Sequence, residues 1–163
     1  MHAYLKTLVV IAIAVELVPT DAQAQEISRI AGTWVLNRAA STFFGFNATR
    51  SEVRTYEDRG DGVVRVTIQV VRRGGDPGDP EYISYTARHD GSEYRMVIRP
   101  PRYPGEGRKT IAFTPVDAYT SDWVVTRNGV RGVTGRSTVS RDGLTYTETD
   151  GFGTVRVFDR REN

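Results

Sequence analysis

Cysteine is absent from the 163 residues of this sequence, and histidine is nearly so. Without cysteine the chain has no disulfide framework, no thiolate metal site and no cysteine nucleophile. Histidine occurs only at His2 and His89, and no G-x-S-x-G, Walker-type or dinucleotide-binding motif is present. We expect no catalytic residue, no metal site and no cofactor, so an enzyme is the least favoured of the functions considered.

An excess of charge of one sign is also lacking. The chain carries 22 basic and 20 acidic side chains, for a formal net charge of +2, and no long block of like charges. Nucleic-acid binding calls for a concentrated basic face. We therefore predict no nucleic-acid partner.

The chain has a single long apolar run, at Leu8–Val15. It follows the basic Lys6 and precedes a polar stretch that ends in Ala24, which is the order typical of a secretory signal peptide. The run is shorter than the roughly 20 apolar residues of a membrane-spanning helix. We predict a signal peptide over residues 1–24, export to the periplasm or the extracellular space, no membrane span after cleavage, and one domain over residues 25–163.

Helical periodicity is almost missing from the rest of the chain, where β-branched and aromatic runs alternate with Asx-Gly dipeptides. These dipeptides tolerate the positive φ angles of two-residue hairpin turns. They are Asp61-Gly62, Asp90-Gly91, Asn128-Gly129, Asp142-Gly143 and Asp150-Gly151. The pattern predicts about ten strands, over residues 32–37, 52–59, 63–72, 81–89, 92–98, 109–115, 119–127, 130–141, 144–149 and 154–160.

Each two-residue turn fixes a register, and the register decides which side chains face inward. At Asp61-Gly62 the turn pairs Asp58 with Arg65 and Arg54 with Gln69 on the outer face, and it turns Glu57 inward. Glu148 is also predicted to face inward, but near the other end of the strands. We therefore expect the two glutamates to lie too far apart to act as an acid/base pair.

The later hairpins give three further expectations about facing. The turn at Asp142-Gly143 places Val139 opposite Tyr146, and the turn at Asp150-Gly151 brings Val155 opposite Tyr146. The turn at Asn128-Gly129 leaves Trp123 facing outward. A β-bulge at either of two glycines in the following strand would reverse that facing; they are Gly132 and Gly135.

Ten antiparallel strands favour closure, because a closed barrel leaves no exposed edge strand. We predict an all-β, up-and-down antiparallel barrel of about 8–10 strands, with a two-sheet sandwich as the alternative. In such a barrel the connections alternate between the two ends. The long connections at 38–51, 73–80 and 99–108 then gather at one end, the open end, together with the turns at 128–129 and 150–153. The short connections at 60–62, 90–91, 116–118 and 142–143 lie at the other end, the closed end.

The first and last predicted strands carry a recognisable pair of features, Gly32-Thr33-Trp34 and Arg160. A Gly-x-Trp motif with an arginine at the end of the last strand resembles the signature of the calycin superfamily of lipocalins and fatty-acid-binding proteins. The resemblance implies that Trp34 packs under the closed end and that Arg160 hydrogen-bonds across it, with Gly32 as the third signature residue. The chain is also similar to a group of uncharacterised bacterial exported lipocalin-like proteins, in the segments Gly32–Asn37, Thr55–Glu57 and Thr138–Gly143.

The loops predicted at the open end combine aromatic rings with arginine. The planar guanidinium suits a carboxylate or phosphate. We therefore hypothesise that the barrel binds or carries a small hydrophobic or amphipathic molecule, with an anionic head near Arg99 or Arg102. The candidate ligand-binding residues are Phe43, Phe44, Phe46, Tyr85, Tyr94, Met96, Arg99, Arg102, Tyr103, Phe113 and Tyr146.

Two alternatives remain open from the sequence. The loop phenylalanines could instead plug the barrel, because a narrow barrel can fill its own interior. The protein would then be an interaction or inhibitor module that acts through its open-end loops. His89, on the hairpin at Asp90-Gly91, is expected to be an ordinary turn residue.

Overall fold

The computed structural model of the chain describes residues 27–44, 48–101 and 107–162 and shows a closed barrel of antiparallel strands. Each strand pairs with its neighbours in the sequence, and the last pairs with the first. The predicted up-and-down barrel is therefore confirmed, and the sandwich is excluded. The ten strands are β1 (Gly32–Leu36), β2 (Thr49–Asp58), β3 (Val63–Arg72), β4 (Glu81–Arg88), β5 (Tyr94–Arg99), β6 (Lys109–Pro115), β7 (Thr120–Arg127), β8 (Val130–Val139), β9 (Thr145–Asp150) and β10 (Val155–Arg160).

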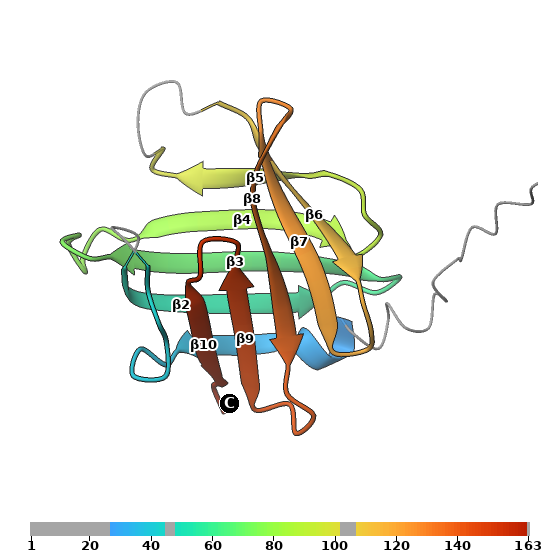
Figure 1. Ribbon diagram of the computed structural model, residues 1–163, viewed down its shortest axis with the longest axis horizontal. Helices are drawn as coiled ribbons and strands as arrows, with labels where there is room; N and C mark the ends of the chain where they lie inside the picture. The colour runs from blue at the N-terminus through green and yellow to red at the C-terminus, as the bar shows by residue number, and fades with distance from the viewer. Residues whose placement is uncertain (1–26, 45–47, 102–106, 163) are drawn as a thin grey trace, which may run out of the picture.

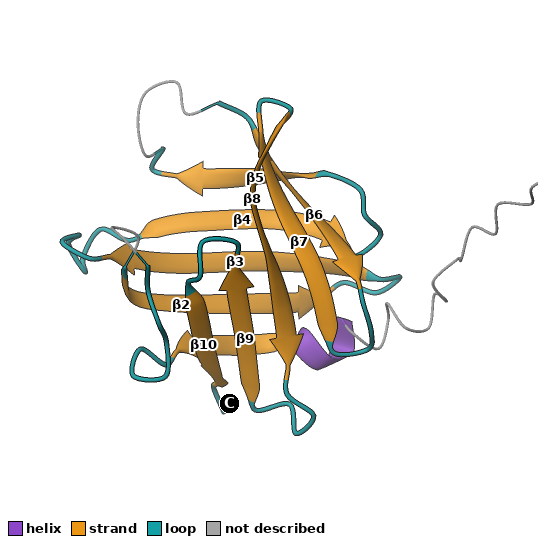
Figure 2. Ribbon diagram, viewed as in Figure 1, coloured by secondary structure: helices purple, strands orange, loops and turns teal. Residues whose placement is uncertain are grey.

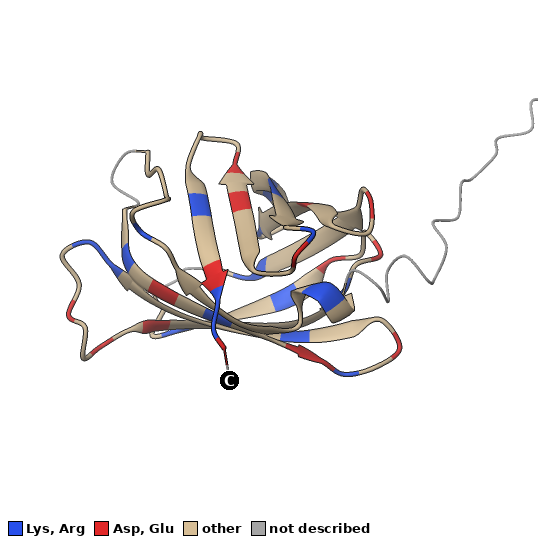
Figure 3. Ribbon diagram, turned by 90° about the horizontal axis from the view of Figure 1, so that it is seen from below, with Lys and Arg blue, Asp and Glu red and all other residues tan. Residues whose placement is uncertain are grey.

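The barrel is flattened into two layers whose strands cross. Figure 1 shows β1 to β5 running across the view, with β6 to β10 running steeply over them. The described helical residues, 27–30, form one short turn beside the start of β1 (Figure 2). No helix among the described residues is long and apolar enough to span a membrane. Basic and acidic positions are interspersed over both layers (Figure 3).

The closed end is built around Trp34, which is fully buried. Its indole nitrogen donates to the Ile30 carbonyl at 2.7 Å, and the Arg160 guanidinium lies 4.2 Å above its ring. Arg160 also donates from Nη1 to the Ala31 carbonyl at 2.6 Å. A Cβ on Gly32, whose φ is +132°, would lie 2.5 Å from Arg160 Nη1, so the close passage of the arginine requires a glycine. The contacts that the Gly-x-Trp resemblance implied are present.

The β2–β3 hairpin corrects the first predicted register. Asp58 lies opposite Val64 rather than Arg65, which is a shift of one residue. The Asp58 carboxylate accepts from the Gly60 amide at 2.8 Å, so the turn begins earlier than the Asp61-Gly62 dipeptide suggested. Because a one-residue shift reverses the two faces of a strand, Glu57 faces outward.

The same shift turns the other face of β2 into the barrel. That face carries Glu52, Arg54 and Tyr56, all of which are buried. Arg54, which the two-residue turn would place on the outer face opposite Gln69, instead lies opposite Ile68. The strand was expected to turn Glu57 inward, and it instead brings the buried Glu52–Arg54 ion pair to the interior.

The β9–β10 connection corrects a second register. Tyr146 lies opposite Phe158, not Val155. The Asp150 carboxylate accepts from the amides of Phe152 and Thr154, both at 3.0 Å, and so holds a longer loop than the predicted two-residue turn. Phe158 is consequently fully buried and packs its ring against Tyr146, with 5.6 Å between the ring centroids.

The β7–β8 hairpin contains the bulge that the sequence left open. The register shifts between Val124 and Thr126, and Trp123 then lies opposite Gly135 with only 7% of its surface exposed. A Cβ on Gly135 would lie 2.2 Å from Trp123 Cζ2, so the indole occupies the space where a side chain would be. The β8–β9 register is as predicted, with Val139 opposite Tyr146.

Candidate ligand-binding cavity

The barrel encloses a cavity of about 350 Å³ above its aromatic closed end. This volume lies at the small end of the range of roughly 300–1,000 Å³ found for small-molecule sites. The described residues that line it are Thr49, Glu52, Arg54, Ile68, Val70, Arg72, Ile83, Tyr85, Met96, Ile98, Lys109, Ile111, Phe113, Trp123, Val125, Arg127, Gly132, Val133, Tyr146, Glu148 and Arg156.

The lining divides into two opposed walls and a rim. The polar wall comes from β2, β9 and β10, which are neighbours around the barrel with only β1 between them. It consists of Thr49, Glu52, Arg54, Glu148 and Arg156. The apolar wall comes from β3 to β8 and consists mainly of Ile68, Val70, Ile83, Met96, Ile98, Ile111, Phe113, Trp123, Val125 and Val133.

The polar wall is held together by ion pairs around Arg54. Arg54 Nε lies 2.6 Å from Glu52 Oε1, and Arg54 Nη2 lies 2.6 Å from Glu148 Oε2. The same Glu148 oxygen accepts from Arg156 Nη1 at 2.9 Å. The side chains of Arg54, Glu52 and Glu148 are only 7%, 5% and 11% exposed, so the cluster is shielded from bulk solvent and the ion pairs are weakly screened.

The pKa values of the cluster follow from burial and from these pairings. Burial lowers the pKa of Arg54, but Glu148 and then Glu52 more than offset this, and the pKa lies well above its ordinary value. Burial raises the pKa of the Glu148 carboxyl, while Arg54 and then Arg156 bring it below its ordinary value of 4.5. Arg54 and Glu148 are therefore both charged at neutral pH.

Tyrosine hydroxyls form the polar part of the cavity floor. The Tyr56 hydroxyl donates to the Tyr146 hydroxyl at 3.3 Å and accepts from Arg54 Nη1 at 3.5 Å. Tyr85 also lines the cavity. Burial is the main reason that the pKa values of all three tyrosines lie above the ordinary value of 10.0. The hydroxyls therefore keep their protons at neutral pH and can donate.

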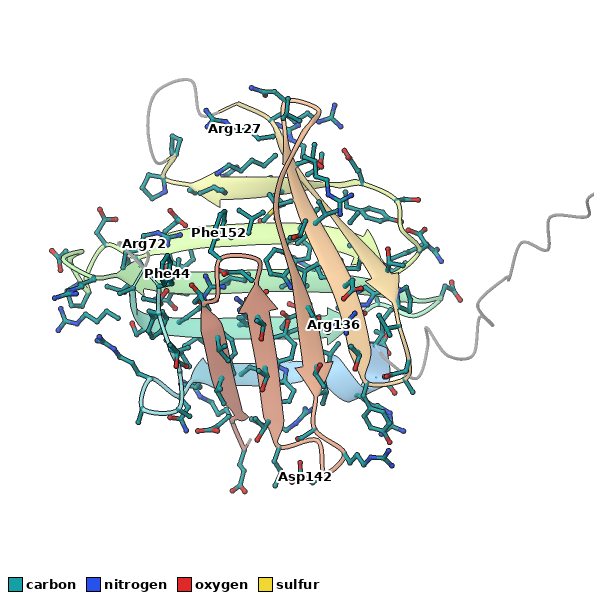
Figure 4. All side chains as sticks on the ribbon, in the orientation of Figure 1. Phe44, Arg72, Arg127, Arg136, Asp142 and Phe152 are labelled. Atoms are coloured by element: carbon teal, nitrogen blue, oxygen red, sulfur yellow. The ribbon has the colours of Figure 1, made fainter. Side chains whose placement is uncertain are left out.

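The rim of the cavity is cationic. Lys109 and Arg127 lie directly opposite each other on β6 and β7, and both line the cavity. Arg72 lies at the open end of β3, where its Nη2 donates to Glu81 Oε1 at 3.0 Å. Figure 4 shows Arg72 and Arg127 on different sides of the open end. An anion entering the barrel would thus meet arginine on more than one strand.

Some donors around the cavity lack partners. Within the described part of the chain, the buried nitrogens Trp123 Nε1, Arg72 Nε and Arg156 Nε have no hydrogen-bond partner, and all three residues line the cavity. Leaving a buried donor unsatisfied costs about 1–3 kcal/mol, and native proteins usually supply a partner or a water. These three nitrogens favour a ligand that carries hydrogen-bond acceptor atoms.

Part of the predicted ligand-binding set lies on the cavity wall: Tyr85, Met96, Phe113 and Tyr146. Tyr94 does not line the cavity, because its hydroxyl donates to Asp90 at 2.9 Å near the closed end. Arg99, one of the two residues expected to contact an anionic head group, is exposed and does not line the cavity.

The predicted aromatic loop lies mostly outside the cavity. Phe44 is 69% exposed and Phe43 is half-buried, and neither lines the cavity. Phe46, Arg102 and Tyr103 lie outside the described residues. The polar wall was not predicted from the sequence. The signal that could have indicated it is Asp58 two residues before Gly60, because this spacing favours an earlier turn and so a register that turns Arg54 inward.

His89 lies in the bend that follows β4, as predicted, and its side chain is packed into the protein. It is only 1% exposed, stacks on Phe113 with 4.5 Å between the ring centroids, and its Nδ1 lies 3.3 Å from Ser121 Oγ. The described residues hold no group of three or more His, Cys, Asp or Glu side chains placed to bind a metal ion.

Fold and cavity together define a closed antiparallel β-barrel of ten strands with room for a small molecule. The chain is similar in structure to a mutant of the fluorescent protein UnaG, with a TM-score of 0.56 at 15% identity, covering 84% of this chain and 99% of that one. Two redesigned β-barrels also align, one at a TM-score of 0.44, 15% identity and coverage of 85% and 96%. The other, mFAP1 bound to DFHBI, aligns at a TM-score of 0.36, 13% identity and coverage of 84% and 99%. No protein-family model and no curated protein matches the sequence.

Proposed function

We propose that this chain is an exported, lipocalin-like barrel that binds a small amphipathic molecule in its cavity and catalyses no reaction. The observation that carries the proposal is the cavity of about 350 Å³, which combines a continuous apolar wall with a cationic rim. Apolar lining with a few placed polar groups is the usual composition of a small-molecule site. The rim favours an anionic ligand, because a cation brought there would be repelled.

The direct test is whether the barrel takes up such molecules. The protein is stripped by lipid extraction, checked by native mass spectrometry, and titrated with palmitate and with anilinonaphthalene sulfonate, an anionic dye whose fluorescence rises in apolar surroundings. We expect saturable binding of one molecule per chain. A stripped protein that binds neither compound would contradict the proposal.

A pair of neighbouring substitutions on β5 identifies the cavity as the site. Met96 lines the cavity, whereas Val97 faces outward and is 36% exposed. Met96→Trp places a larger ring in the cavity and should weaken dye binding at least tenfold, while Val97→Trp should leave it within about twofold, because alternate strand residues face opposite sides. Equal effects of the two substitutions would place the dye elsewhere.

Export is the second part of the proposal, and it rests on the N-terminal pattern of Lys6, an apolar run and Ala24. Expression of the full chain in a bacterium, followed by cell fractionation and N-terminal sequencing, tests it. We expect a product in the periplasm or the medium that begins at Gln25. A full-length product in the cytoplasm would contradict it.

A second function, protein interaction through the open-end loops, is favoured by one observation. Phe44 and Phe152 are 69% and 62% exposed. They lie on adjoining loops (Figure 4), where the Phe44 amide donates to Thr154 Oγ1 at 3.4 Å. A double Phe44→Ser/Phe152→Ser variant that keeps dye binding but loses a protein partner recovered by crosslinking would support this function.

A further inference from the structure

The cavity is polar along one side rather than at one end. We infer that the ligand is a facially amphipathic molecule, with acceptor and donor groups spread along one edge and an apolar face opposite. The inference rests on the proposed function, since it names the class of molecule that the same cavity would bind.

The polar wall is continuous along the cavity. Thr49, Glu52 and Arg54 lie on one strand, and the rise of about 3.3 Å per residue spreads them over roughly 16 Å. Glu148 and Arg156, on β9 and β10, extend the same wall around the barrel. The polar groups therefore run along the cavity and are not gathered at its mouth.

An apolar surface faces the polar wall across the cavity. β3 to β8 contribute a nearly unbroken apolar surface, and the polar groups on their cavity-lining side chains are the Trp123 indole nitrogen, the Tyr85 hydroxyl at the floor and the cations of the rim, Arg72, Lys109 and Arg127. A chain-like molecule with one terminal head group would satisfy the rim but lay methylene groups against Glu52, Arg54 and Glu148. Covering charged groups with methylene is unfavourable, because their remaining hydrogen-bond capacity is lost.

The polar wall offers both hydrogen-bond donors and hydrogen-bond acceptors. Glu52 Oε1 and Glu148 Oε2 are engaged by Arg54, and each carboxylate has a second oxygen that can accept. Arg156 Nε lacks a hydrogen-bond partner within the described residues, and the Tyr146 hydroxyl at the floor keeps its proton. The wall thus presents donors and acceptors side by side, which matches hydroxyl and carbonyl groups placed next to one another on a rigid edge.

A matched pair of coloured compounds tests the inference. Rhein is an anthraquinone carboxylate with two hydroxyls flanking a carbonyl on one long edge, and anthraquinone-2-carboxylate has the same rings and charge without those hydroxyls. Titrations followed by absorbance and calorimetry should show rhein binding about tenfold tighter, as expected for two additional hydrogen bonds of ordinary strength. Palmitate, with one head group, should bind more weakly than rhein.

Substitutions on the two walls separate the sources of affinity. Thr49→Val and Glu52→Gln change the polar wall with little change of volume and should reduce the preference for rhein to threefold or less. Ile98→Val on the apolar wall should weaken both anthraquinones equally and keep the preference. Thermal melting of each variant shows that it is folded, and the preference of the unsubstituted protein tests the inference without any variant.

Different results would overturn the facially amphipathic ligand and the proposed ligand binding. Equal affinity for the two anthraquinones, or tighter binding of palmitate, overturns the facial inference and leaves ligand binding in place. A preference for rhein that survives both polar-wall substitutions also overturns it. Saturable binding of none of the three compounds overturns the proposed function itself.

Discussion

Replacing Arg54 by methionine isolates the energetics of the buried charge cluster. The substitution keeps most of the side-chain volume but removes the cation that Glu52 and Glu148 each approach at 2.6 Å, and it leaves Glu148 with Arg156 alone; the two side chains are 5% and 11% exposed. Removing one partner of a buried pair costs about 3–5 kcal/mol, because the remaining charge is buried and unpaired. For a domain of this size that corresponds to a fall of roughly 10–15 °C in the melting temperature.

The pH dependence of this loss identifies its cause. In the unsubstituted protein the pKa of Glu148 is lowered on folding, so its stabilising contribution is complete above its ordinary value of 4.5 and is lost as the pH falls through the lower folded pKa. In Arg54→Met, Glu148 keeps only Arg156 as a cationic partner, so its buried carboxylate is less stabilised when charged and part of the loss is recovered on protonation. The difference in unfolding free energy between the two proteins should therefore be largest above about pH 5 and shrink on acidification.

Urea unfolding followed by tryptophan fluorescence between pH 3.5 and pH 7.5 measures this difference directly. Arg65→Met, the same substitution on the exposed face of β3, is the matched control and should change stability by less than about 0.5 kcal/mol. Adding Glu52→Gln and Glu148→Gln to the Arg54 variant should restore much of the loss. A difference below about 1 kcal/mol, or one that does not change with pH, would refute the reasoning.

Two glycines give further predictions about packing. Gly135→Ala should destabilise the barrel by about 1–3 kcal/mol or more, because the new Cβ would lie 2.2 Å from Trp123 Cζ2 and 2.4 Å from a backbone oxygen. Gly132→Ala, which meets only a backbone oxygen at 3.1 Å, is the milder control in the same unfolding experiment, and equal losses would contradict the packing argument. Gly32→Ala should cost about 1–3 kcal/mol through its positive φ and its collision with Arg160, and an unchanged melting temperature would show that the closed end adjusts freely.

The strands, their order and the closed end could be predicted from sequence because each depends on local signals. Asx-Gly dipeptides mark the turns, and a Gly-x-Trp motif with a distant arginine marks the two strands that close the barrel. The structure places Trp34 opposite Arg160 across the β1–β10 pairing, where the resemblance implied that they meet.

The polar wall could not be predicted in the same way, because it depends on register. Counting from Asp61-Gly62 places Arg54 outside, whereas the Asp58 carboxylate starts the turn earlier and brings Arg54 inside. A shift of one residue in the β2–β3 hairpin therefore decides whether Arg54 and Glu52 lie on the surface or in the cavity. The content of the open-end loops predicts contacts to an anionic head at Arg99 or Arg102, whereas the structure lines the cavity with strand residues such as Arg156.

Tryptophan quenching tests the central claim most directly, because one of the two tryptophans lines the cavity and the other is buried at the closed end. Titration with rhein should quench Trp123 saturably at one molecule per chain, and the quenching should be retained in Trp34→Phe and largely lost in Trp123→Phe. Met96→Trp should shift the titration to at least tenfold higher concentration. Linear, non-saturating quenching that is the same in all of these proteins would contradict binding inside the barrel.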